Sequence, residues 1–429
     1  MGNDTKRRLA AAAAFLMLAT AGSRVLGLVR EQVMLAYLGL TPAMGAFTVA
    51  FKVPGLIRTL LADTALSAAF IPVFSELLQK DRRREAWQVA YTITFLATLI
   101  LGAVSVLGMV FAPQLIGLFG FRDPAVFELA VNLTRIMFPS VVVLGVAGIF
   151  MGILNTYDHF SLPALAPIVW NLVIIGSVAI FARRHGEQGF YALAWGVLAG
   201  TVMELLIQVP AVWRRREQVS GLLALGHPAV RQTGRLLGPV VLSLGIINFN
   251  AFIDTWVATI YISDTAPAII DKAFRLFQLP QGMFAVAIGT VLFPTLSRLA
   301  TGGRTAEFRA SLSTGIRQIF FITLPFTAFF IMLGGPTVRL LFQHGLFTSA
   351  DTHEVARALA FFSLGMAFVS ANTLLNRAFY GIQKAWLPLM LGVGNLALNA
   401  GLDLLLYKPL GPGASPCLPR SSRHSTFLG

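Results

Sequence analysis

The stretch from residue 23 to residue 76 most constrains the fold, because it is apolar enough to enter a bilayer and still carries charge. Its charged residues are Arg24, Arg30, Glu31, Lys52, Arg58 and Asp63, with Glu76 at its end. A charge near the bilayer centre costs roughly 3 kcal/mol on insertion scales. We therefore expect the four cations to line a polar cavity rather than face lipid, which makes them candidates for a binding function.

Composition places the whole chain in the membrane class. The 429 residues are 56% hydrophobic and 12% charged, whereas a soluble domain carries about 25% charged residues. The net charge of +14 comes from residues in short loops and inside apolar segments. Loop charge of this kind signals membrane orientation, so no nucleic-acid partner is expected. The single cysteine, Cys417, excludes an internal disulfide and a cysteine-based metal site.

Spans of about 20 mostly apolar residues predict an all-α polytopic membrane protein with about 11 helices. They are expected near 9–38, 44–78, 88–112, 125–154, 163–182, 188–213, 237–262, 267–298, 311–334, 352–380 and 386–407. The first is interpreted as a retained span, since no small-residue cleavage site precedes Arg24. Basic residues at the N-terminus and near 80–84, 214–216 and 298–309 then fall on one side, which predicts a cytoplasmic N-terminus.

An internal repeat links the two halves of the chain. FKVP at 51–54 recurs as FQLP at 277–280, and FIPVFSEL at 70–77 recurs as LFPTLSRL at 292–299. Two further pairs of matches share an offset of about 225 residues. Duplication of this kind predicts two pseudo-symmetric helical lobes on a 6+6 plan, as in transporters built from parallel repeats.

Four segments follow from this plan. We expect an N-terminal lobe over 1–216, an amphipathic cytoplasmic linker over 217–236, a C-terminal lobe over 237–410 and a polar tail over 411–429. The repeat also predicts a twelfth helix, but the sequence changes from apolar to polar, rich in serine and arginine, near Ala414. A frameshift or truncation there is the favoured interpretation, with a naturally short tail as the alternative.

Several of these motifs resemble the MurJ/MviN family, the lipid II flippases of the MOP exporter superfamily. The similarity lies in SRVLG at 23–27 through Arg30, AF at 46–47 through FKVP at 51–54, FIP at 70–72, GILNT at 152–156, LPALAP at 162–167, the segment 275–280, and LFQHG at 341–345. Two positions depart from the family pattern, because Gly45 and Phe274 stand where acidic residues are usual.

The resemblance implies a flippase that alternates between inward and outward states and moves a polyprenyl-pyrophosphate-linked peptidoglycan precursor across the bacterial cytoplasmic membrane. It also implies that cavity cations hold the pyrophosphate. These map onto Arg24, Arg30, Arg58 and Arg275, with Lys52 beside them. Arginine suits this role because its guanidinium forms bidentate bonds to phosphate.

Polar residues in later spans suggest ion coupling. Asp254 lies inside an apolar segment, and Asn399 and Asp403 lie four apart, on one helix face. Together they are a candidate site for Na⁺ or a proton relay, with helix–helix hydrogen bonding as the alternative. No cofactor and no metal ion are expected. Glu31, seven residues after Arg24, is a candidate partner for that arginine.

Other functions receive less support. A flippase for another polyprenyl-linked glycan is the nearest alternative. A membrane glycosyltransferase would need a sizeable external loop with a catalytic carboxylate, and no loop expected from the sequence is long enough. A non-transporting scaffold or an inactive truncated product is the third alternative, and it would account for the polar tail. Nucleotide-binding GxxxxGK[ST], HExxH and GxSxG motifs are absent from the sequence, so we expect a monomeric transporter rather than an enzyme. Contact with the cell-wall synthesis machinery is a further expectation.

Overall fold

The computed structural model describes residues 3–58, 64–181, 187–217 and 223–382, with short pieces at 386–387, 390–392 and 394. Helices dominate these residues, and no strand occurs among them. Six of the described helices are long and apolar enough to cross a membrane, or seven if one bent pair counts as a single span. The expectation of an all-α polytopic membrane protein is confirmed.

The chain divides into two compact units. Unit 1 comprises residues 1–256 with 344–346, and unit 2 comprises 257–343 with 347–429. The boundary between the units follows Trp256. The sequence-based boundaries lay earlier, with the N-terminal lobe ending at 216 and the C-terminal lobe beginning at 237. The reason is that residues 228–236, expected in a separate linker, begin the same continuous helix as the span that follows them.

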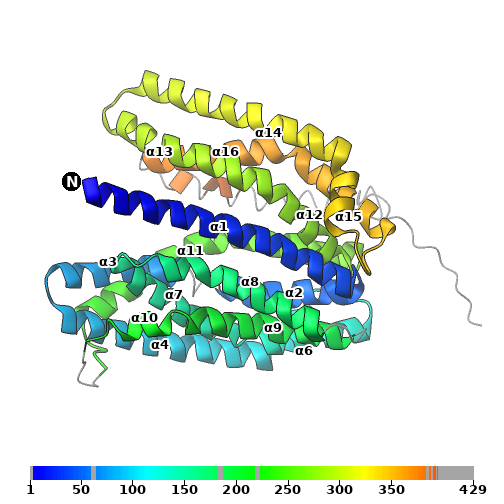
Figure 1. Ribbon diagram of the computed structural model, residues 1–429, viewed down its shortest axis with the longest axis horizontal. Helices are drawn as coiled ribbons and strands as arrows, with labels where there is room; N and C mark the ends of the chain where they lie inside the picture. The colour runs from blue at the N-terminus through cyan, green and yellow to red at the C-terminus, as the bar shows by residue number, and fades with distance from the viewer. Residues whose placement is uncertain are drawn as a thin grey trace, which may run out of the picture. The chain divides into compact units, whose positions relative to one another are not determined.

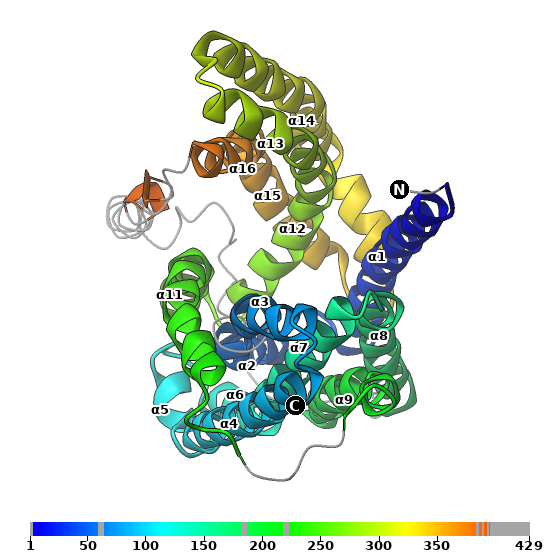
Figure 2. The ribbon, with the colours of Figure 1, turned by 90° about the vertical axis from the view of Figure 1, so that its left-hand side faces the viewer.

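The helices of unit 1 are shown in Figures 1 and 2. They are α1 (Asn3–Leu38), α2 (Pro42–Ile57), α3 (Thr64–Gln79), α4 (Arg83–Val110), α5 (Ala112–Gly117), α6 (Pro124–Met137), α7 (Ser140–Thr156), α8 (Ser161–Phe181), α9 (Glu187–Leu206), α10 (Val209–Trp213) and α11 (Pro228–Val257). Within this unit α8 packs against both α1 and α9, and α2 packs against α6.

Unit 2 begins at the end of α11. Its elements are the π-helical η2 (Ala258–Ile262), α12 (Ala266–Pro280), the π-helical η3 (Gln281–Ala285), α13 (Val286–Thr301), α14 (Thr305–Phe342), α15 (Ser349–Leu364) and α16 (Met366–Gly381). Here α14 packs against α15 and α16, and α12 packs against α15. The expected span 386–407 lies almost wholly outside the described residues.

Several predicted spans are interrupted where the sequence supplies a reason. The span expected over 125–154 is present as one candidate span, Pro124–Thr156. A two-residue turn at Phe138-Pro139 separates α6 from α7 within it, because proline lacks the N–H that continues a helix. The span expected over 352–380 bends by 48° between α15 and α16. Pro280, in the FQLP motif, is followed directly by the π-helical η3; such turns interrupt α-helices and often mark functional sites.

Aromatic packing forms the core at one end of unit 1. Phe70 and Phe74 on α3 stack at 5.1 Å, and Phe74 meets Trp87 of α4 edge-on at 6.1 Å. Ile149 and Leu154 of α7 complete this buried cluster. A residue and its neighbour four positions on share a helix face, so the phenylalanine pair in FIPVFSEL acts as one apolar surface.

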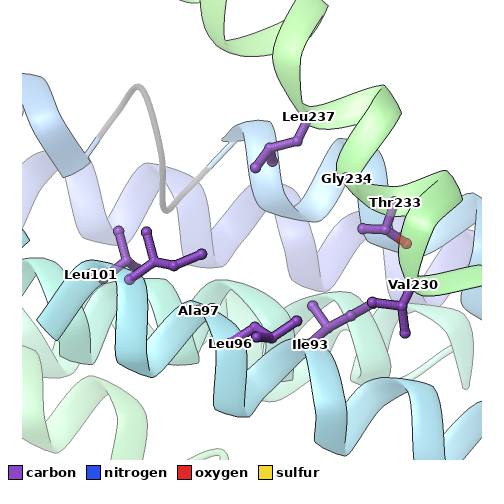
Figure 3. A pocket seen from close by; sticks show the side chains of 9 residues that line it. Ile93, Leu96, Ala97, Leu101, Val230, Thr233, Gly234 and Leu237 are labelled. Carbon is purple, nitrogen blue, oxygen red and sulfur yellow. The ribbon is translucent and has the colours of Figure 1, made fainter. Parts of the chain in front are cut away.

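A second apolar region of unit 1 lies between α4 and α11 and is shown in Figure 3. Its cavity of about 140 Å³ is lined by Ile93, Leu96, Ala97, Ile100, Leu101, Val230, Thr233, Gly234 and Leu237. The hydroxyl of Thr233 donates to the carbonyl of Ala229 within its own helix. Since no charged side chain lines this cavity, it offers nothing to hold a phosphate.

Candidate functional site

Arg30 is the most deeply placed of the predicted site residues in unit 1. Its side chain on α1 retains 8% exposure, and its Nη2 lies 2.6 Å from Oε1 of Glu31, which retains 3%. Nη1 donates to Oδ1 of Asn171 on α8 at 3.1 Å. A buried guanidinium is tolerated only when paired and hydrogen-bonded, and this arrangement meets both conditions.

Trp170 adds a third kind of contact to the same arginine. Its ring centroid lies 4.7 Å from the Arg30 guanidinium carbon, within cation–π range. The ring also meets Phe51 of α2, with centroids 6.4 Å apart. Asn171 is fixed as well, because its Nδ2 donates to the carbonyl of Pro167 at 2.9 Å. Side chains from α1, α2 and α8 therefore hold Arg30 in one orientation.

The interpretation of Glu31 as the partner of Arg24 is corrected by these contacts. Glu31 pairs with Arg30, its direct neighbour in the sequence, while Arg24 is exposed. Six residues at 3.6 per turn place Arg24 and Arg30 about 120° apart on a straight helix, and the difference in burial agrees with that angle.

Lys52 and Arg58 complete the predicted set in unit 1. The Nζ of Lys52 donates to the hydroxyl of Thr255 on α11 at 2.5 Å, and Thr255 is 1% exposed. Arg58 is half-buried directly after α2. Thr255 is a partner that sequence reasoning missed, since it lies 203 positions from Lys52 and no local pattern connects them.

Unit 2 contributes Arg275, which is one member of a charged triplet on α12. Its Nε lies 2.9 Å from Oδ2 of Asp271, and the Nζ of Lys272 lies 3.3 Å from the same oxygen. The Lys272 side chain is 2% exposed and that of Arg275 is 37%. Sequence reasoning missed Asp271 and Lys272. The four-residue spacing of Asp271 and Arg275 was the available signal.

This triplet also bears on the sequence departure at Phe274. That position carries an aromatic ring that stacks with Phe277 at 5.7 Å. The carboxylate that neutralises Arg275 comes instead from Asp271, one helical turn earlier. Arg275 therefore has a carboxylate partner although position 274 is a phenylalanine.

Of the three residues in the candidate ion site, only Asp254 lies within the part of the chain that the structure describes. Asp254 is half-buried on α11, next to Thr255. Asn399 and Asp403 lie outside the described residues. Among the residues that the structure describes, no three His, Cys, Asp or Glu side chains gather as they would around a metal ion.

Comparisons with known proteins identify the family. The model of the family "Lipid II flippase MurJ" matches residues 34–413. A lipid II flippase MurJ from Burkholderia cenocepacia is 31% identical over 396 residues, which is 90% of this chain and 76% of the relative. A probable lipid II flippase MurJ from Rhizobium meliloti is 32% identical over 406 residues, covering 91% and 74%.

Solved structures agree with this assignment. A lipid II flippase MurJ in an inward closed conformation superposes with a TM-score of 0.78 at 25% identity, covering 94% of this chain and 83% of that one. An inward-facing MATE-family multidrug transporter of the MOP superfamily shares the fold, with a TM-score of 0.72 at 16% identity over 92% and 90% of the two chains. The buried cations therefore lie in a transporter fold rather than an enzyme, and the chain belongs to the MurJ family of lipid II flippases.

Proposed function

We propose that this chain translocates undecaprenyl-pyrophosphate-linked peptidoglycan precursor from the inner to the outer leaflet by alternating access. The family membership and the names of its relatives support the substrate. The observation that carries the mechanism is the pairing of cations with carboxylates: the buried Arg30 with Glu31 in unit 1, and the buried Lys272 and partly exposed Arg275 with Asp271 in unit 2.

These pairs suggest how the site stays stable without substrate. An unpaired cation in a low-dielectric interior is strongly destabilising, so Glu31 and Asp271 neutralise the cations while no pyrophosphate is bound. The pyrophosphate then competes with the carboxylates, because phosphate oxygens accept short, charge-assisted bonds from arginine. In this proposal Arg24, Arg30, Lys52, Arg58 and Arg275 contact the pyrophosphate, and Glu31 and Asp271 are displaced partners.

The proposal also covers the energy source for transport and the location of the protein in the cell. The sequence lacks a nucleotide-binding loop, so membrane potential or a Na⁺ or H⁺ gradient would drive the cycle. Asp254, with Asn399 and Asp403, is the proposed ion site. The protein would act as a monomer in the bacterial cytoplasmic membrane, with its N-terminus in the cytoplasm and the cell-wall synthesis machinery nearby.

Complementation tests this function. The full chain would be expressed in a bacterium whose own lipid II flippase is depleted, and growth and accumulated lipid II would be measured. We expect rescue by the unchanged chain, and at least a roughly tenfold loss of flipping with Arg30→Ala, because charged hydrogen bonds contribute about 1.5–3 kcal/mol each. Arg304→Ala removes an exposed arginine and is the control for loss of charge.

Two results would contradict the proposal. If Arg30→Ala rescues as well as Arg304→Ala at equal membrane expression, the pyrophosphate is not held by Arg30. If the unchanged, membrane-inserted chain fails to rescue but restores export of another polyprenyl-linked glycan, the substrate assignment is wrong. The second result would favour a flippase for another polyprenyl-linked glycan, the alternative raised by the sequence departure at Gly45, which is buried on α2.

A further inference from the structure

A pocket outside the predicted pyrophosphate site opens at one end of unit 1. Its volume is about 590 Å³, and it lies where the loop between α7 and α8 meets α8 and the ends of α9 and α10. The lining residues are His159, Leu162, Ile207, Pro210, Ala211, Arg214 and Arg215. None of the residues proposed to contact pyrophosphate is among them, so this pocket is a separate candidate site.

The lining of the pocket combines basic and apolar side chains. Arg214 and Arg215 supply two positive charges, and none of the seven lining residues is acidic. Partial burial lowers the pKa of His159, and the charge of Arg215 lowers it further. The acidic residues closest in sequence, Asp158 and Glu217, lie outside the lining set. The pocket therefore favours an anion with an apolar portion.

Arg215 is held in place by its surroundings. Its Nη1 donates to the carbonyl of Ala211 at 3.1 Å, and its guanidinium lies 5.9 Å from the centroid of the Tyr157 ring. The Tyr157 hydroxyl accepts from Nε1 of Trp87 at 3.2 Å, and Phe74 meets the ring edge-on. Because the aromatic core fixes Tyr157, the arginine beside it is positioned before any ligand arrives.

The depth of the pocket follows from the end of the neighbouring span. The apolar stretch Gln188–Trp213 ends at a tryptophan that is 60% exposed. Arg216 lies over that ring, with 3.3 Å between the guanidinium carbon and the centroid. Tryptophan gathers at the level of lipid headgroups, and basic pockets between helices at this level bind anionic headgroups.

We propose that this pocket binds one anionic phospholipid. Its phosphate would contact the guanidinium groups of Arg214 and Arg215, with His159 beside them. One acyl chain would run along Leu162, Ile207 and Pro210. The bound lipid would fill the junction of α7, α8, α9 and α10, so it would stabilise unit 1 independently of any transported substrate.

Lipid titration of the full purified chain tests the proposal. The delipidated protein in detergent would be titrated with phosphatidylglycerol, phosphatidylcholine and inorganic phosphate, and bound lipid counted by native mass spectrometry. We expect a preference for phosphatidylglycerol that falls about tenfold or more in the Arg214→Gln, Arg215→Gln double variant, since each basic residue near an anionic headgroup contributes measurably. The matched control is Arg83→Gln with Arg84→Gln, another adjacent pair of arginines in unit 1.

Each other outcome overturns the assignment. Equal affinity for phosphatidylglycerol and phosphatidylcholine would mean that the pocket does not select anionic lipid. An equal loss in the control pair would mean diffuse charge attraction. Displacement of lipid by inorganic phosphate at equal concentration would mean a free-anion site. If the double variant loses its helical circular dichroism, Arg214→Gln alone replaces it, since that side chain is exposed.

Discussion

Arg30 and Glu31 illustrate how a membrane protein keeps a charge in its interior. They are adjacent in sequence, yet both side chains lie on the buried side of α1 and meet at 2.6 Å. Asn171 and Trp170 of α8 complete the surroundings of the guanidinium. The cation is therefore both neutralised and oriented, and under the function proposed above the pyrophosphate would meet an arginine already held in position.

Replacement of the carboxylate tests this view at the scale of one residue. Glu31→Gln removes the carboxylate that lies 2.6 Å from the buried Arg30 guanidinium, so we expect a loss of roughly 3 kcal/mol, the usual cost of breaking a buried ion pair. Thermal unfolding in detergent measures the effect. Glu76→Gln is the matched control, because it breaks the exposed pair with Lys80. Equal stability of the two variants would contradict a stabilising role for the Arg30–Glu31 pair.

At the scale of elements, close packing of α4 depends on a missing side chain. Gly108 lies where α4 crosses the break between α6 and α7, and a Cβ there would meet the ring of Phe138 at 2.1 Å. Phe138 is fully buried, so its ring has little room to move. The break at Phe138-Pro139 is thus also a packing point for a third helix.

Two alanine substitutions on α4 separate packing from helix propensity. Gly108→Ala should destabilise by about 1–3 kcal/mol, because overpacking forces neighbouring side chains from their preferred positions. Gly102→Ala lies on the same helix with open space around it. It should be neutral or stabilise by up to about 1 kcal/mol, since alanine favours helix. Thermal unfolding compares the two, and a destabilised Gly102→Ala together with a neutral Gly108→Ala would refute the packing argument.

At the scale of the whole molecule, the basic loops predict the orientation in the membrane. Within unit 2, α14 runs over 38 residues from Thr305 to Phe342, about 57 Å at 1.5 Å per residue. Its ends therefore reach opposite sides of a bilayer. Arg298, Arg304 and Arg309 surround its first end, and the positive-inside rule places that end in the cytoplasm.

Cysteine labelling checks this orientation. With Cys417 replaced by serine, Arg304→Cys and His344→Cys would each be treated with a membrane-impermeant maleimide in intact spheroplasts. We expect labelling at 344 and protection at 304, with both labelled after permeabilisation. Both positions are exposed, so protection would report the bilayer rather than burial. The reverse pattern would place the basic loops outside.

The fold class and the cations were determined by the sequence itself. In a bilayer every backbone polar group needs an internal partner, so apolar runs of this length predict helices without tertiary information. Charges inside those runs similarly mark Arg30, Lys52 and Arg275 as functional candidates. What they contact was decided by tertiary structure, because Asn171 and Thr255 lie 141 and 203 positions from their cations.

The positions of the helix interruptions and of the boundary between the two units were also decided by tertiary structure. A run such as 125–154 is mostly apolar, with Glu128 and Arg135 among its few charged residues, and hydropathy does not show whether a helix is interrupted at its proline. Tertiary packing decides whether the helix is interrupted at such a proline, as it is at Phe138-Pro139. Residues 228–236 belong to the segment 217–236, which the sequence predicts as an amphipathic linker. They form the start of α11, where Ala229 is buried with the aromatic core of unit 1, a contact that no local pattern specifies.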